Sequence, residues 1–142
     1  MPDFLFNTQY SDVDKVYAFN RVMKDVSMQE KPDVILLGIP DSLLPLNNKH
    51  RFSFGLYAYE IFNAVQPDFV ITSLMANNGY NDEFYSEISK MAKYKYNVNI
   101  DAYFVSQFCP LSNSIWSEKL SYVYLSRMEL PKQSIRFIQP AT

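Results

Sequence analysis

The chain is poor in the residues from which compact metal and disulfide sites are built. Among 142 residues it has one cysteine, one histidine and one tryptophan. A single cysteine, Cys109, excludes an internal disulfide and any metal site made of several cysteines. With His50 as the single histidine, a zinc site of the usual nitrogen and sulfur ligands is not expected either. We therefore expect no metal and no cofactor.

Glycine, charge imbalance and long apolar runs are also scarce. The three glycines form neither G-x-x-x-x-G-K-[ST] nor G-x-G-x-x-G, the two common phosphate-binding patterns. The formal net charge of −2 gives no sign of the broad basic surface that nucleic acids require. No apolar run approaches the roughly 18 residues of a membrane span, and the N-terminus lacks the features of a secretory signal. We expect a soluble, cytoplasmic protein that binds neither nucleic acid nor membrane.

What the sequence has is enough apolar and aromatic material for one core. It is 48% hydrophobic, with eleven tyrosines and eleven phenylalanines, and its length is close to that of a common domain. A single domain over residues 1–142 is predicted.

Short apolar runs alternate with helical patterns along the chain. Helices are predicted from Ser11 or Asp12 to just before Pro32, over 55–65 and over 81–96. Strands are predicted over 4–6, 34–39, 69–74 and 100–108, with further extended pieces at 120–126 and 134–138. The runs 34–39 and 69–74 are apolar at nearly every position, which is typical of strands covered on both faces. The order predicts an α/β, Rossmann-like fold, with one open, mainly parallel sheet of about four or five strands between helices on both faces.

In such a sheet, ligands bind beyond the carboxyl ends of the strands. The loops expected there are 40–54, 75–81 and 107–116, and the first has fifteen residues where about two to six are usual. The three glycines, Gly38, Gly55 and Gly79, fall on the same predicted rim. Glycine allows tight turns and close approach of a ligand, so both explanations stay open.

The polar half of the long loop leads directly into a predicted helix N-terminus, where unpaired N–H groups favour an anion. Glu60, farther along that helix, is expected either to face solvent or to pair with a loop cation such as Arg51. The residues predicted to bind a ligand are Asn47, Asn48, Lys49, Arg51, Ser53, Gly55 and Glu60. The alternative is that Lys49, His50 and Arg51 are ordinary solvated loop charges.

No catalytic residues are predicted. His50 has no neighbouring nucleophile and is interpreted as a loop histidine, and Cys109 as a half-buried free thiol. The stretch LSYVYLS, 120–126, suits the edge of a sheet. Such an edge can accept an extended peptide as an added strand, or it can pair with another copy of the chain.

One block of about forty residues resembles a known family. The matching features are Pro32-Asp33, Gly38-Ile39-Pro40, Pro45, Asn47-Asn48-Lys49, Phe54-Gly55, Ala58-Tyr59-Glu60, Ala64-Val65 and Pro67-Asp68. In order and spacing they are similar to the C-terminal part of the peptide maturation system protein family. Its members are longer proteins encoded beside radical-SAM maturases and ribosomally made precursor peptides. The resemblance implies a role in peptide maturation and names no reaction.

Two hypotheses follow. The first is a non-catalytic accessory protein that holds the precursor peptide or a peptide-modifying enzyme. The alternative is a small-molecule domain or enzyme remnant that binds an anion or nucleotide at the carboxyl ends of the strands. A homodimer through the aromatic edge is a third arrangement.

Overall fold

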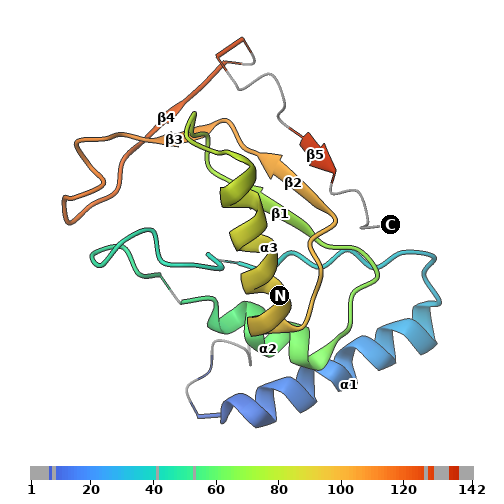
Figure 1. Cartoon of the computed structure of the whole chain (residues 1–142). Coiled ribbons are helices and arrows are strands. Elements are labelled where there is room, and N and C mark those ends of the chain that lie inside the picture. Colours follow the sequence, from blue (N-terminus) through green and yellow to red (C-terminus); the bar gives the residue numbers. More distant parts are fainter. Residues whose placement is uncertain are drawn as a thin grey trace. The chain divides into compact units, whose positions relative to one another are not determined.

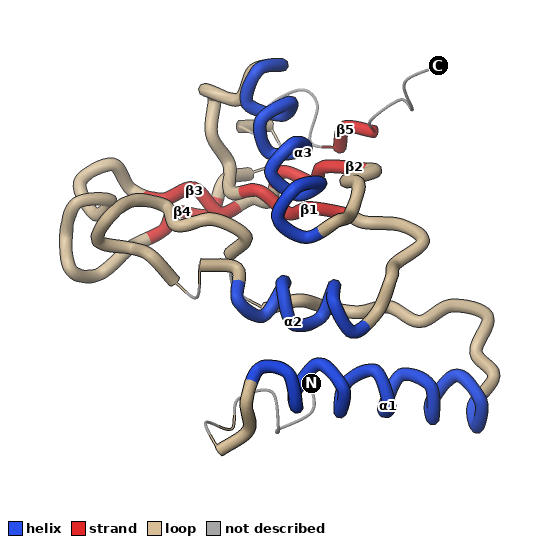
Figure 2. Tube along the Cα trace, turned by 60° about the horizontal axis from the view of Figure 1, so that its bottom comes forward, coloured by secondary structure: helices blue, strands red, loops and turns tan. Residues whose placement is uncertain are grey.

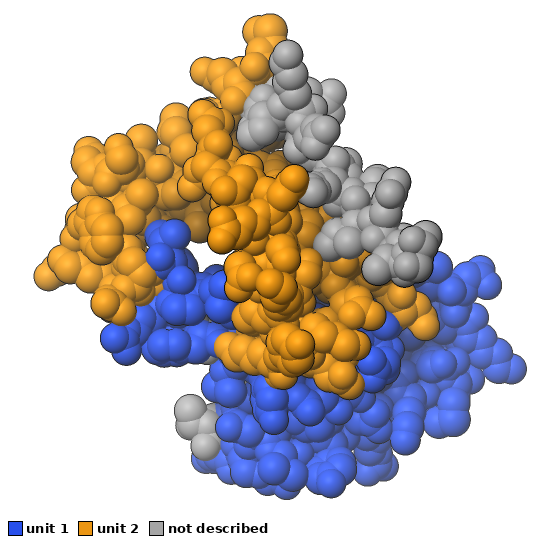
Figure 3. All heavy atoms as spheres, viewed as in Figure 1, with its two compact units in different colours: residues 1–46, 51–67 blue, residues 47–50, 68–142 orange. Residues whose placement is uncertain are grey.

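The computed structural model describes residues 7, 9–40, 42–52, 54–126, 128–129 and 135–137. It divides into two compact units, drawn in different colours in Figure 3. Unit 1 comprises residues 1–46 and 51–67, and unit 2 comprises residues 47–50 and 68–142. Each unit is described by itself below, and the single domain over 1–142 stays a prediction.

Unit 1 is built on two helices, α1 (Asp12–Glu30) and α2 (Leu56–Ala64). The predicted start of α1 is confirmed, because the Ser11 hydroxyl accepts a hydrogen bond from the Asp14 N–H. The side chain of Asn20 donates to the Ala64 carbonyl oxygen at 2.6 Å. A shared cluster centres on Phe19, Ile61 and Ala64. The two helices run side by side, as Figures 1 and 2 show.

The predicted buried strand 34–39 is wrong. No strand is assigned to these residues, and the side chains of Val34 and Leu36 are 81% and 92% exposed. Leu37 and Ile39, by contrast, pack against the helix cluster of unit 1. An unbroken apolar run predicts a segment covered on both faces, whereas in the described structure only part of this run is covered. The predicted strand 4–6 lies outside the described residues.

Unit 2 holds a three-stranded sheet in the order β1-β2-β5. Its members are β1 (Ile71–Leu74), β2 (Ala102–Val105) and β5 (Ile135–Phe137), and only the β1–β2 pair is parallel. Helix α3 (Asp82–Tyr96) lies across one face of this sheet (Figures 1 and 2). Its predicted features are confirmed: Asn81 caps the N-terminus, acidic residues occupy the first turn, and lysines the last.

A second, two-stranded sheet in unit 2 consists of β3 (Phe108–Pro110) and β4 (Tyr122–Tyr124). The predicted strand 100–108 is therefore two strands, since β2 ends at Val105 and β3 belongs to the other sheet. The extended pieces predicted at 120–126 and 134–138 are found as β4 and β5. We refer to β3, β4 and their connecting loop as the ribbon.

The predicted three-layer open sheet is wrong. The described strands form two small sheets with a single parallel pair, so there is no sheet of four or five mainly parallel strands between two layers of helices. The physical reason is that 34–39, predicted to be a strand of that sheet, forms no ladder, and the chain after β2 turns into an antiparallel pair. None of the described helices is long and apolar enough to cross a membrane.

Candidate binding site

The structure divides the predicted binding residues between the two units. Asn47, Asn48 and Lys49 belong to unit 2, and the remaining described members belong to unit 1, namely Arg51, Gly55 and Glu60. Ser53 lies outside the described residues. The residues predicted to bind an anion therefore fall into two sets, one in each unit.

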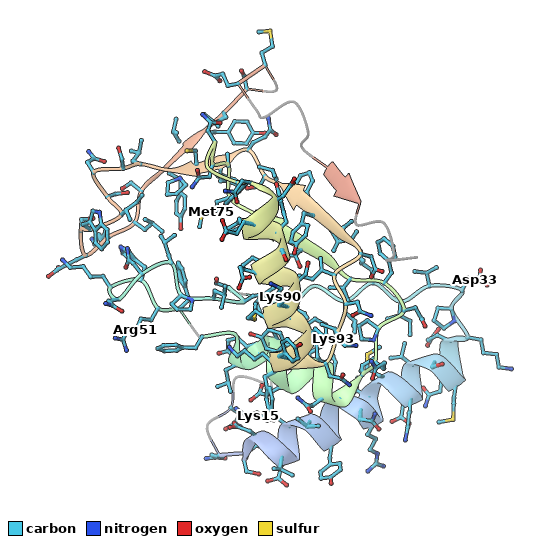
Figure 4. All side chains as sticks on the ribbon, viewed as in Figure 1. Lys15, Asp33, Arg51, Met75, Lys90 and Lys93 are labelled. Atoms are coloured by element: carbon cyan, nitrogen blue, oxygen red, sulfur yellow. The ribbon has the colours of Figure 1, made fainter. Side chains whose placement is uncertain are left out.

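In unit 1, Glu60 lies in the core and is only 1% exposed. Its Oε1 atom is 3.4 Å from the Nζ atom of Lys15, itself 9% exposed, which is labelled on α1 in Figure 4. Asp12 lies 3.6 Å from the same ammonium group. The expectation that Glu60 faces solvent or pairs with Arg51 is thus wrong, because its cation is Lys15.

The environment of Glu60 is costly for a charge. Burial raises the pKa of its carboxyl group, and the attraction of Lys15 opposes this rise only in part. The second carboxylate oxygen, Oε2, is buried and has no hydrogen-bond partner among the described residues. The pair therefore joins α1 and α2 through one long contact, beside the Asn20 bond and the apolar cluster.

The turn before α2 contains several residues in the left-handed backbone conformation. Gly55 has φ 75°, a conformation that glycine adopts without strain, and Phe52 and Phe54 also have positive φ. The Arg51 guanidinium lies 5.8 Å from the centre of the Phe54 ring. The glycine at the predicted rim is thus explained by a tight turn.

In unit 2, the segment Asn47–His50 is a tight polar turn attached to the ribbon. The Asn47 Oδ1 atom accepts hydrogen bonds from the backbone N–H groups of Lys49 and His50, each at 2.8 Å. The Asn47 amide donates to the carbonyl oxygen of Ile115 at 2.7 Å, and the Lys49 ammonium donates to that of Trp116 at 2.7 Å. Two of the residues predicted to bind an anion therefore hold the loop of the ribbon.

Replacing Asn47 with alanine should loosen this turn. The substitution removes two acceptor contacts and one donor contact, and we expect a loss of about 1–2 kcal/mol of stability. Amide exchange at Lys49 and His50 should become faster, as measured by hydrogen–deuterium exchange. Asn78→Ala, at an exposed asparagine in another loop of unit 2, is the control. Unchanged exchange at Lys49 and His50 would show that the turn does not depend on Asn47.

The carboxyl end of β1 is occupied by packed aromatic side chains. The Tyr80 hydroxyl donates to the carbonyl oxygen of Met75 at 2.8 Å, and its ring stacks on Phe84 at 4.4 Å. Burial, with smaller contributions from Tyr85 and Cys109, raises the pKa of Tyr80 to about 12. Tyr80 therefore stays protonated at neutral pH, and the second predicted rim loop is held by packing.

The ribbon is a regular antiparallel ladder. Its ladder pairs Phe108 with Tyr124, Cys109 with Val123 and Pro110 with Tyr122. The Leu111 N–H donates to the Ser121 carbonyl oxygen, and the Leu125 N–H donates to the Gln107 carbonyl oxygen. These two bonds show which pairs of the ladder are hydrogen-bonded. In an antiparallel ladder, hydrogen-bonded pairs alternate with non-bonded pairs. The backbone N–H and C=O groups of Val123 therefore point toward Cys109.

The backbone N–H and C=O groups of Tyr122 and Tyr124 consequently point away from β3. Pro110, which has no N–H, lies opposite Tyr122 in a non-bonded pair, so no ladder bond is lost there. In the part of the chain that the structure describes, β4 pairs with β3 alone. This outer side of β4 is called the β4 edge below.

The side chains at the β4 edge are aromatic and exposed. Tyr122 is 45% exposed and Tyr124 is 62% exposed. The Tyr124 ring makes an edge-to-face contact with Phe108 at 5.6 Å, and its hydroxyl bonds to the side chain of Gln107. Residues 120–126 contain no charged side chain. Charge and proline are the usual means by which proteins block an open edge, and β4 has neither.

The other predicted candidates make no catalytic arrangement. Cys109 is half-buried, as expected, and its thiol lies 3.8 Å from the carbonyl oxygen of Pro110. His50 has a buried Nε2 atom without a hydrogen-bond partner among the described residues. Within those residues no group of three or more histidine, cysteine, aspartate or glutamate side chains could hold a metal ion.

Sequence reasoning missed Lys15 and Asn20, the two polar residues with which α1 contacts α2. The signal available was weak: both lie among the apolar positions of an amphipathic helix. Their partners, Glu60 and the Ala64 carbonyl, are more than forty residues farther along the chain.

Comparison with known proteins identifies no relative: no family model, no curated protein and no solved structure matches the sequence. The similarity to the peptide maturation system family therefore stays a prediction from the sequence.

Proposed function

We propose that this chain is a non-catalytic binding protein that holds an extended peptide along the β4 edge. The biological setting, maturation of a ribosomally made peptide, comes from the sequence resemblance alone, and the precursor peptide is the ligand it implies. The observation that carries the proposal is the outer side of β4, where the backbone groups of Tyr122 and Tyr124 face away from β3.

Strand addition uses the groups that this edge offers. An added strand forms main-chain hydrogen bonds with the outward N–H and C=O groups, and its alternate side chains contact those of the edge strand. Tyr122, Tyr124 and Phe108 lie on one face of the ribbon, as the ladder register requires. The bound segment should therefore carry apolar or aromatic residues at alternate positions, since these pair best with exposed aromatic side chains.

The rest of unit 2 supports the ribbon as a preformed surface. The loop between its strands is held by Asn47 and Lys49, through the carbonyl oxygens of Ile115 and Trp116. The Ser114 hydroxyl, in a residue only 6% exposed, donates to Leu111 or Ser121 and accepts from the Ser121 N–H at 3.0 Å. A fixed ribbon lowers the entropic cost of binding, because the edge does not have to be ordered by the peptide.

The test is a calorimetric titration with a precursor peptide of the kind that the resemblance implies. Tyr122→Pro removes an outward N–H and the aromatic ring, and Tyr122→Ala removes the ring alone, so the difference between them reports on the main-chain bond. Neither change touches a ladder bond to β3. Because one hydrogen bond contributes about 1 kcal/mol, the proline variant should bind about fivefold more weakly than the alanine variant.

Far-UV circular dichroism of both variants checks that each remains folded. Equal binding by the two variants, or no binding of the peptide by the unmodified chain, would contradict the proposal. A second titration with the neighbouring peptide-modifying enzyme tests the other partner implied by the resemblance. No observation in the structure favours the alternative of a small-molecule anion or nucleotide site, whose predicted residues divide between the two units.

A further inference from the structure

We propose that a second copy of this chain pairs with the β4 edge, in an antiparallel arrangement about a two-fold axis at Val123. The proposal does not need the peptide, because it follows from the backbone pattern of β4 itself. The outward groups belong to Tyr122 and Tyr124, and these residues are spaced equally on either side of Val123.

The two-fold axis fixes the register. Tyr122 lies opposite Tyr124 of the partner subunit, and Tyr124 lies opposite Tyr122 of the partner subunit. Each of these pairs exchanges both of its N–H···O bonds, as hydrogen-bonded pairs in antiparallel sheets do. Val123 then lies opposite Val123 of the partner subunit in a non-bonded pair, where Cα atoms approach to about 4.5 Å. A closed two-fold contact uses the same surface on both copies.

The side chains fit this register. Residues paired across two strands lie on the same face, so the tyrosines of both copies would form one aromatic row beside the Phe108–Tyr124 contact. Val123, which is 41% exposed, would meet its equivalent on the opposite face. β-Branched side chains directly opposite each other are favourable in sheets.

The charges of the described strand do not oppose a second copy. Identical edges that carry like charges repel each other, and Tyr122, Val123 and Tyr124 carry none. The described strand has three residues, so the buried area should be below the roughly 1,200 Å² of a standard stable interface. We therefore expect a weak dimer whose population rises with protein concentration. Since pairing uses the backbone groups assigned to the peptide, a bound peptide would dissociate the dimer.

A charge-exchange experiment tests this register. In Val123→Glu and in Val123→Lys, two like charges would lie directly opposite each other, and self-association should weaken by about tenfold. In an equimolar mixture the opposite charges meet, and association should return to at least the level of the unmodified chain. Sedimentation equilibrium over a wide concentration range measures all three samples. Val34→Glu and Val34→Lys, at a valine that is 81% exposed in unit 1, are the matched controls.

Dimerisation of both Val123 variants as strong as that of the unmodified chain would overturn the proposal, and so would a mixture that stays monomeric. A monomeric unmodified chain at high concentration would also overturn it. If either variant fails to fold by circular dichroism, the comparison of Tyr122→Pro with Tyr122→Ala in the same sedimentation assay replaces it, with weaker dimerisation of the proline variant expected. These results need no peptide, so they are distinguishable from success or failure of the peptide titration.

Discussion

Replacing Lys15 with methionine should destabilise the protein by about 3–5 kcal/mol. The change keeps the side chain long but removes its charge, and it leaves the carboxylate of Glu60 in the core without its cation. An uncompensated buried charge is among the most costly defects that one substitution can create. Urea unfolding, followed by helical circular dichroism, measures the loss in the free energy of unfolding.

The matched control is the double variant Lys15→Met with Glu60→Leu. It removes both charges, and well-packed apolar replacements of buried ion pairs are commonly neutral or stabilising. We therefore expect the double variant to recover most of the stability that the single variant loses. If both variants are destabilised equally, the effect would come from packing, and the argument from an unpaired charge would be wrong.

The loss in the single variant should depend on pH. The pKa of Glu60 is already raised above its ordinary value of 4.5 by burial, and Lys15 opposes that rise. Without Lys15 the pKa of Glu60 in the folded protein should rise further. A group whose pKa is raised on folding contributes stability that is present below its unfolded pKa and is lost as the pH rises through the folded value. The deficit should thus be largest near neutral pH and should shrink toward pH 4.5 and below.

Replacing Tyr103 with alanine should cost about 3–5 kcal/mol, a range typical of large aromatic side chains in cores. Tyr103 on β2 is fully buried, its ring lies 4.8 Å from that of Tyr85, and its hydroxyl contacts the backbone carbonyl of Tyr85 and the hydroxyl of Ser89. These contacts attach β2 to α3. The loss of the ring would leave a cavity between the sheet and helix α3.

Two further variants separate the contributions of the ring and the hydroxyl. Tyr103→Phe keeps the ring and should lose only about 1–2 kcal/mol. The neighbouring Phe104 lies on the other face of the sheet, and its side chain is 42% exposed. Phe104→Ala should therefore cost less stability than Tyr103→Ala. Chemical unfolding of all three variants gives the comparison. A cost for Phe104→Ala as large as that for Tyr103→Ala would contradict the assignment of the covered face.

The helices could be predicted because their signals are local. Ser11 and Asn81 cap α1 and α3 within three residues of the groups they bind, and Lys31 and Asn97 end the same helices in left-handed conformations. These contacts need no knowledge of the rest of the chain.

The sheet could not be predicted in the same way. A strand is defined by its ladder partner, and the apolar run 34–39 carries no information on whether such a partner exists. Alternation was equally ambiguous: β1, expected to be buried on both faces, leaves Ile71 61% exposed while Thr72 is buried.

The candidate site was predicted in part. The tyrosine-rich, strand-like stretch 120–126 suits a sheet edge, and β4 lies within it. The polar turn 47–50 was also singled out, but its contacts with Ile115 and Trp116 join residues more than sixty positions apart. Sequence patterns report the polarity of such a segment without its partner, so these contacts could not be predicted.

The measurement that tests the peptide-binding proposal most directly is residue-resolved amide exchange with and without a precursor peptide of the kind that the resemblance implies, at a protein concentration low enough to keep the chain monomeric. The Tyr122 and Tyr124 amides face outward from the ladder and should become protected on binding, while the Val123 amide, directed toward Cys109, should change little. This alternation is specific to an added strand. Binding that leaves the Tyr122 and Tyr124 amides unchanged, or that protects only residues 47–50, would contradict the account.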